Sequence, residues 1–425
     1  MAVSLPKLRL DLEFLPSPVP DRPGLLIRDP YRYSDSTLIV PPLLTNSLRL
    51  LDGAHTDLDL RESLAQVTGR LEVSEVSWQF LSALSEAGFL NDGTFDVLRQ
   101  RRHADFASAE RRDAIHAGGG YPAGLTELEA KLRGWMAEAP RTPPAGFPTR
   151  LGASGSGAAA PGNALVGIAA PHVSPFAAPA TYSAAYAALP AEAATRTFVI
   201  LGTSHYGAPG KFGLTRKPFR TPLGDAVTDT ALVDRLAAAA PQSFLVEDYC
   251  HSIEHSIEFH VLFLQSRFGA GVKIVPILCG PLLAAHPEDD RGVAAALAAL
   301  GDLHAREGNG LLWVLGIDMA HMGRRYGDRW RARAHTGEMQ AITAREGARL
   351  DRVAGGDADG FWRLVLGDGA PGRRGDDELK WCGAAPLYTF LRAVPAARGG
   401  VLAYDQWNID EDSVVSFAAM SFTGS

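Results

Sequence analysis

Cysteine is scarce in this sequence, whose 425 residues include only Cys250, Cys279 and Cys382. Three cysteines cannot build a disulfide framework for a chain of this length, so we expect buried thiols or a metal ligand. Long apolar runs are also missing, and no apolar segment follows the basic residues near the N-terminus. These absences exclude a transmembrane helix and a secretory signal peptide, and the expected location is the cytoplasm.

Clusters of positive charge are missing too. The formal net charge is −7, and the arginines within 101–113 are interspersed with acidic residues. Proteins that bind nucleic acid carry a basic patch, so we expect neither nucleic acid nor a membrane as a partner. Hydrophobic residues make up 46% and charged residues 21% of the chain, which is typical of a globular protein.

The length exceeds that of one ordinary hydrophobic core, and the composition changes along the chain. Residues 1–115 are predicted to form a small N-terminal α+β domain. Glycine, proline and alanine dominate 116–162, which predicts a linker with one helix at 125–138 and a domain boundary near 155–162. Residues 163–425 are predicted to form the main domain.

Short strands and amphipathic helices are expected in the N-terminal domain. The strands are predicted at 25–28 and 38–40, and the helices at 43–51, 60–68 and 74–87. The Leu51-Asp-Gly53 turn and the segment 84–90 resemble the winged-helix-like PqqD type of domain, which binds leader peptides in peptide-modifying systems. The alternative is a helical docking domain.

Strand-like and helical patterns alternate from residue 164 onward. The predicted strands are 164–170, 197–203, 272–278, 311–317, 401–404 and 414–418, and the helices are 182–189, 228–240, 255–268, 291–300, 335–353 and 383–394. Thr221-Pro-Leu-Gly-Asp225 predicts a turn, because proline presets φ and glycine permits positive φ. This alternation is typical of an α/β layered domain with a largely parallel sheet.

Side chains that bind metals or transfer protons follow three of these strands. His172 follows the first, His205 follows the second, and Asp318 and His321 follow the strand 311–317. Cys382 lies at the start of a predicted helix. If the strands are parallel neighbours, these groups meet at one edge of the sheet, where ligands of α/β proteins bind. Two imidazoles and a thiolate suit Fe(II), copper or zinc; the alternative is a set of unrelated polar groups.

A second pattern competes with the first. His251-Ser-Ile-Glu254-His255 matches H-x-x-E-H, the helix motif of inverted zinc peptidases. On a helix the two histidines would share one face and bind zinc, with Glu254 as the general base. The alternative is a polar start of a helix.

Seven short blocks in one order resemble the Memo family, the protein B-like component of bacterial AmmeMemoRadiSam systems. They are Ala170-Pro-His172, Leu201-Gly-Thr-Ser-His-Tyr206, Thr221-Pro-Leu-Gly-Asp225, Glu254-His-Ser-Ile-Glu258, Val275-Pro-Ile-Leu-Cys-Gly280, Asp318-Met-Ala-His321 and Cys382-Gly383. The resemblance covers about 164–420, and the family is similar in fold to class III extradiol dioxygenases.

The resemblance implies a site with a defined ligand set. Its metal ligands are His172, His205 and Cys382, and the catalytic side chains beside them are His321, His255 and Asp318. Fe(II) is the implied metal, with copper or zinc as alternatives. The segment after His172 differs from the family pattern: the family usually has a Gly-Tyr pair, and this chain has Val173-Ser-Pro-Phe176. The resemblance therefore does not predict the substrate.

Three functions are consistent with these residues. The first is a non-haem Fe(II)-dependent oxidoreductase of the dioxygenase type, acting on a small-molecule or peptide substrate with a radical-SAM system protein as a possible partner. The second is a non-catalytic protein that binds iron, copper or a peptide. The third is a zinc hydrolase that uses His251, Glu254 and His255. Cys382 stands where extradiol enzymes usually have a carboxylate ligand. Because a thiolate is softer and donates more charge, we do not expect ordinary catechol cleavage.

Overall fold

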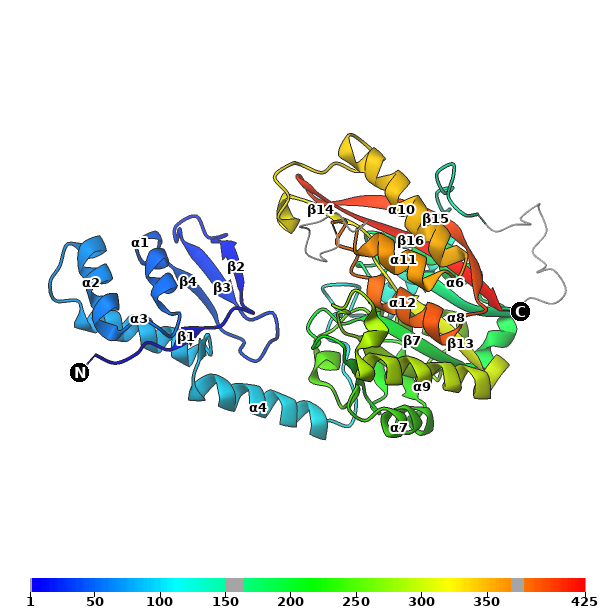
Figure 1. Cartoon of the computed structure of the whole chain (residues 1–425), viewed down its shortest axis with the longest axis horizontal. Coiled ribbons are helices and arrows are strands. Elements are labelled where there is room, and N and C mark those ends of the chain that lie inside the picture. The colour runs from blue at the N-terminus through cyan, green and yellow to red at the C-terminus, as the bar shows by residue number, and fades with distance from the viewer. Residues whose placement is uncertain (1, 150–163, 368–377, 425) are drawn as a thin grey trace. The chain divides into compact units, whose positions relative to one another are not determined.

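The computed structural model describes residues 2–149, 164–367 and 378–424. The chain divides into two compact units, one ending at Ser108 and one starting at Ala109 (Figure 1). In the described residues, no helix is both long enough and apolar enough to cross a membrane.

The first unit contains a small antiparallel sheet and four helices among its described residues. Its strands are β2 (Glu13–Pro16), β3 (Leu25–Arg28) and β4 (Thr37–Val40), and β1 (Lys7–Leu8) pairs with β5 (Leu90–Asn91). Its helices are α1 (Pro42–Thr45), α2 (Asp57–Thr68), α3 (Ser74–Glu86) and α4 (Gly93–Ser108). Helix α4 was not predicted because it buries only Phe95 and Phe106 and so lacks an apolar stripe. The PqqD-like function of this unit stays a prediction.

Four parallel strands form the centre of the second unit. They are β12 (Lys273–Cys279), β7 (Thr197–Thr203), β13 (Leu311–Gly316) and β6 (Ala164–Ala170), in that order across the sheet. Every residue of β7 is buried, as the run of apolar residues predicted. The largely parallel α/β sheet is therefore confirmed.

Antiparallel and short strands extend this core to 11 strands within the described part of the chain. The long strands β15 (Arg398–Asp410) and β16 (Ser413–Gly424) pair with each other, and β16 also pairs with β6. The short strands are β8 (Phe212–Leu214), β9 (Phe219–Thr221), β10 (Gly224–Thr228), β11 (Phe244–Val246) and β14 (His321–Gly323). Strands β9 and β10 form a hairpin at Pro222 and Leu223, so the predicted turn is present.

Helices cover both faces of the sheet. In β7, Val199 and Leu201 belong to one buried cluster, and Phe198 and Ile200 belong to the other, as the two-residue period of a strand requires. The first cluster includes residues from α7 (Thr230–Ala239), α9 (Arg291–Glu307), α10 (Glu338–Ala354), α11 (Ala358–Val365) and α12 (Ala384–Ala393). The second includes residues from α5 (Leu125–Ala137), α6 (Pro179–Ala187) and α8 (Glu258–Phe268).

The prediction of a linker over 116–162 is wrong as far as residue 149. Leu128, Leu132 and Trp135 of α5 are buried in the second cluster, and Trp135 contacts Phe263 at a ring distance of 6.3 Å. Gly118 lies in a turn of the packed structure rather than in a spacer, and its φ is +87°. The predicted boundary near 155–162 lies outside the described residues.

Candidate metal centre

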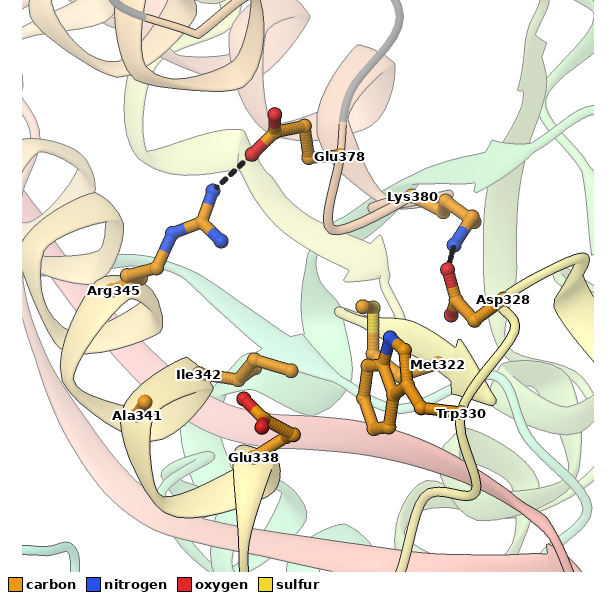
Figure 2. Close-up of a pocket in the computed structure, with 9 residues that line it drawn as sticks. All are labelled: Met322, Asp328, Trp330, Glu338, Ala341, Ile342, Arg345, Glu378 and Lys380. Atoms are coloured by element: carbon orange, nitrogen blue, oxygen red, sulfur yellow. Dashed lines mark hydrogen bonds and ion pairs between the residues drawn. The ribbon is translucent and has the colours of Figure 1, made fainter. Parts of the chain in front are cut away.

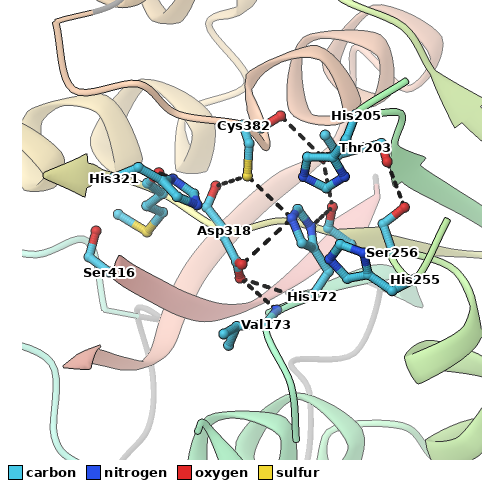
Figure 3. A network of polar contacts seen from close by, with 12 residues as sticks. His172, Val173, Thr203, His205, His255, Ser256, Asp318, His321, Cys382 and Ser416 are labelled. Carbon is cyan, nitrogen blue, oxygen red and sulfur yellow. Dashed lines mark hydrogen bonds and ion pairs between the residues drawn. The ribbon is translucent and has the colours of Figure 1, made fainter. Parts of the chain in front are cut away.

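The three neighbouring strands β6, β7 and β13 end at the same edge of the sheet. The segments that follow them carry His172, His205 and Asp318, and Figure 3 shows these side chains together with Cys382. Cys382 reaches this edge because Gly383 follows it. A Cβ atom on Gly383 would lie 2.6 Å from Ile317 Cβ and 2.8 Å from the Asp318 carbonyl oxygen, so a larger residue would not fit.

Two imidazoles and one thiol converge at this edge. The ligand atoms of His172, His205 and Cys382 all lie within 4.8 Å of one another. The Cys382 Sγ atom is 3.2 Å from His172 Nε2. Ligands at about 2.0–2.3 Å from one metal are about 3–4 Å apart, so this spacing fits a shared ion. The structure therefore brings together the three residues that the sequence predicted as ligands.

Hydrogen bonds orient both histidines for this role. His172 Nδ1 is 3.0 Å from the Gly316 carbonyl oxygen, and His205 Nδ1 is 2.9 Å from Glu254 Oε1. Because these partners can only accept, we assign the proton to Nδ1 in each ring. The Nε2 lone pairs are then available at the site, as in histidines that bind metals. Burial lowers the pKa of His172 well below its usual value, which keeps this ring neutral.

Glu254 is the residue that the sequence predictions misjudged. Its buried carboxylate accepts hydrogen bonds from the His205 amide and ring, and Oε1 is 3.1 Å from His255 Nδ1. The two imidazoles consequently stack, with centroids 5.0 Å apart and an interplanar angle of 13°. Burial by itself would raise the pKa of Glu254, but the two imidazoles outweigh it and hold the pKa well below its usual value. The same contact raises the pKa of His205 against the effect of burial.

A buried ion pair holds the segment that carries Glu254. Arg112 pairs with Glu258, and neither side chain is exposed. Its other guanidinium nitrogens donate to the carbonyl oxygens of His251 at 2.9 Å and Glu254 at 2.6 Å. The sequence analysis gave Arg112 no role, because these partners lie more than 130 residues away. The signal that pointed to this region was the block Glu254–Glu258.

Asp318 and His321 line the same site. Asp318 Oδ1 accepts the amides of His172 at 3.0 Å and Val173 at 3.2 Å, which fixes the loop after β6. Burial raises the pKa of Asp318 and lowers that of His321. His321 Nδ1 lies 2.9 Å from the Met319 carbonyl oxygen, so the proton sits there and Nε2 can accept. The ligand atoms of Asp318, His321 and Cys382 also lie within 4.8 Å of one another.

The inverted zinc-peptidase prediction is wrong. Tyr249–Ser252 forms a short 3₁₀ helix, and α8 starts only at Glu258. His251 and His255 therefore do not share a helix face. The buried His251 ring points elsewhere, with Nε2 3.0 Å from the Gly213 carbonyl oxygen. Glu254 and His255 belong to the predicted metal centre instead.

The other two cysteines do not belong to the candidate ligand set. Cys250 and Cys279 are buried free thiols. Burial raises the pKa of both, that of Cys279 to about 12. Neither belongs to a potential metal-binding group within the part of the chain that the structure describes.

Comparison with known proteins identifies the family. The sequence profile of the Memo-like proteins matches residues 112–421, which is most of the chain. The chain belongs to the Memo-like family. A MEMO1 family protein of Aquifex aeolicus is 27% identical over 304 residues, covering 71% of this chain and 73% of that protein. A MEMO1 family protein of Thermus thermophilus is 28% identical over 246 residues, covering 58% of this chain and 65% of that protein.

One solved structure is also similar to this Memo-like chain. It is an uncharacterized protein from Escherichia coli K12, with a TM-score of 0.35 and 12% sequence identity over 61% of this chain and 99% of that chain. The family match starts at Arg112, the residue whose guanidinium holds the Glu254 segment.

Proposed function

We propose that the second unit binds one metal ion through His172, His205 and Cys382 and acts as a non-haem Fe(II)-dependent oxidoreductase of the dioxygenase type. The observation that carries the proposal is the convergence of two oriented Nε2 atoms and one thiol at the carboxyl edge of a parallel sheet. Nitrogen and sulfur donors of this kind suit Fe(II), with copper or zinc as competing metals.

Bound Fe(II) would supply the one-electron chemistry that allows O₂ to react with an electron-rich substrate. The chain's own residues would position the substrate and transfer its protons. His321 is neutral with a free Nε2, so it can accept a proton from a substrate hydroxyl. Asp318 lines the same site and would be the second group that exchanges a proton with the substrate. Glu254 holds His255 beside His205, where His255 can also accept a proton from the substrate.

Metal analysis and oxygen uptake test this proposal. We expect anaerobically purified protein to contain one iron per chain and to consume O₂ with an electron-rich substrate such as an aminophenol. Cys382→Ser should lose most of the metal, whereas Cys250→Ala should keep it because Cys250 lies outside the site. Iron that Cys382→Ser retains in full would contradict the ligand assignment.

A non-catalytic metal-binding protein is the second candidate. The observation that favours it is Cys382, because a soft thiolate strengthens copper binding and donates more charge to iron than a carboxylate does. Stoichiometric copper or iron without O₂ uptake would support this candidate over the oxidoreductase.

A further inference from the structure

A cavity of about 420 Å³ opens beside the candidate metal centre. His205 and Cys382 are among its lining residues. Its apolar lining includes Leu282 after β12, Trp362 in α11, Leu366 directly after α11, and Trp381. Small-molecule sites usually measure about 300–1,000 Å³, with apolar walls and a few polar groups at one place, and this cavity has that form.

The aromatic walls of the cavity are held in place. Trp362 donates its indole N–H to the Ala284 carbonyl oxygen at 3.1 Å, so its only polar group is satisfied. The Arg349 guanidinium lies 5.1 Å from the Trp381 ring centroid, and Phe361 packs against the same ring at 5.9 Å. Two fixed indoles favour a flat apolar occupant, because ring contacts add to the gain from burial.

The cavity offers almost no charge to an occupant. Lys380 is the only charged side chain among its described lining residues, and no carboxylate contributes. The Lys380 ammonium is 2.8 Å from Asp328, and both residues line a second cavity of about 500 Å³. Figure 2 shows this pair and the neighbouring Arg345–Glu378 pair. A charged ligand body would therefore lose its hydration without gaining a partner.

We propose that this cavity binds the uncharged aromatic part of the substrate, whose oxygen donor lies beside His205 and Cys382. The inference rests on the proposed function, because the donor would bind the metal held there. It adds a substrate class: a compact aromatic molecule with a hydroxyl or similar oxygen group, rather than a charged aliphatic one.

Hydroxamates of two sizes test the inference on the whole metal-loaded chain. Benzohydroxamate and acetohydroxamate carry the same metal-binding group, and only the first has a ring to bury. We expect benzohydroxamate to bind about tenfold more tightly or better. Leu366→Trp should fill the cavity and abolish this preference without changing metal content or acetohydroxamate affinity. Leu364→Trp, in α11 but outside the lining, should keep the preference.

A metal-free experiment separates failure of this inference from failure of the proposed function. Calorimetric titration of metal-free protein with 2-naphthol should show saturable binding, which Leu366→Trp loses and Leu364→Trp keeps. If the protein binds no metal but binds 2-naphthol in this way, the proposed function fails and the aromatic cavity stands. Equal affinity for both hydroxamates in the wild type, or no saturable binding of 2-naphthol, would overturn the inference.

Discussion

One carboxylate organises the imidazoles of the candidate centre. Glu254 contacts the rings of His205 and His255 through the same oxygen, and Arg112 holds its backbone from the other side. A charged acceptor at Nδ1 raises the basicity of Nε2 in a metal-binding histidine and fixes its ring. The strength of the metal site should therefore depend on a residue that does not touch the metal.

Replacing Glu254 by glutamine tests this dependence. The amide has nearly the same size but no charge, and its NH₂ cannot accept the His205 proton. We expect metal affinity to fall by about 10–100-fold in Glu254→Gln. Competition with a chromophoric chelator measures the change. The control is Glu288→Gln, which removes an exposed carboxylate that pairs with Arg392; an equal loss in both variants would contradict the account.

A buried histidine behind the site makes stability depend on pH. Burial lowers the pKa of His260 to about 3, and its Nε2 atom has no hydrogen-bond partner among the described residues. The unfolded state binds a proton near pH 6.5 and the folded state does not. The stability that neutral His260 provides is therefore complete above pH 6.5 and is lost as the pH falls toward 3.

When the pH falls from 7.5 to 5.5, protonation of His260 in the unfolded state should lower the free energy of unfolding by about 1.4 kcal/mol. Urea unfolding followed by tryptophan fluorescence measures it, since every tryptophan except Trp78 lies in the second unit. His260→Asn should unfold with a correspondingly weaker pH dependence. An unchanged pH dependence in the variant would show that His260 titrates equally in both states.

At this scale the sequence located the three candidate ligands, which the structure brings together, better than the residues that support them. His172, His205 and Cys382 come together because each lies next to a regular element whose pattern is readable. Glu254 belongs to two overlapping motifs in the sequence, and H-x-x-E-H predicts a helix until the 3₁₀ turn at 249–252 is known. Arg112 could not be placed, since no local pattern reports a contact across more than 130 residues.

At the scale of elements, β13 packs closely against the segment that precedes α8. A Cβ atom on Gly316 would lie 2.6 Å from both the Ser256 carbonyl oxygen and His260 Nε2. The Gly316 carbonyl oxygen is also the acceptor for His172 Nδ1. Close packing around Gly316 therefore sets the position of one candidate ligand, His172.

Gly316→Ala should destabilise the second unit by about 1–3 kcal/mol, because the backbone has to move to admit a methyl group. It should also weaken metal binding by shifting the acceptor of His172. Gly134→Ala is the matched control: this glycine lies in α5 with open space around it, so we expect a gain of up to about 1 kcal/mol. If the urea midpoints of both variants shifted in the same direction, the proposed close packing at Gly316 would be contradicted.

The sequence predicted strands correctly where it contains long runs of apolar residues. The expected strand ranges 164–170 and 197–203 are those observed for β6 and β7. Strands β8, β9 and β11 have three residues each, too few to show a period, and β8 and β11 pair with each other although they are not adjacent in sequence. Helix α8 starts three residues later than predicted because Glu254 and His255 are held by the metal-centre contacts.

At the scale of the whole molecule, each unit has its own hydrophobic core. The buried cluster of the first unit draws its members from Leu5 to Leu90, and the clusters of the second unit begin at Tyr121. Composition predicted a linker over 116–162, whereas the structure starts the second unit at Ala109 and buries α5 within it.

A chain of residues 109–425 should therefore fold alone and bind metal with the same stoichiometry and affinity as the full chain. Chelator competition and the urea midpoint of tryptophan fluorescence measure both properties. A soluble fragment that has lost metal affinity would show that the first unit contributes to the site.

X-ray absorption at the metal edge tests the central claim most directly. The whole chain, loaded with Fe(II) under anaerobic conditions, should show two imidazole ligands and one sulfur ligand on a single iron. Cys382→Ser should lose the sulfur contribution, and Cys250→Ala should give the wild-type spectrum. A wild-type spectrum without sulfur, or one that Cys382→Ser leaves unchanged, would contradict the assignment of His172, His205 and Cys382 as the metal ligands.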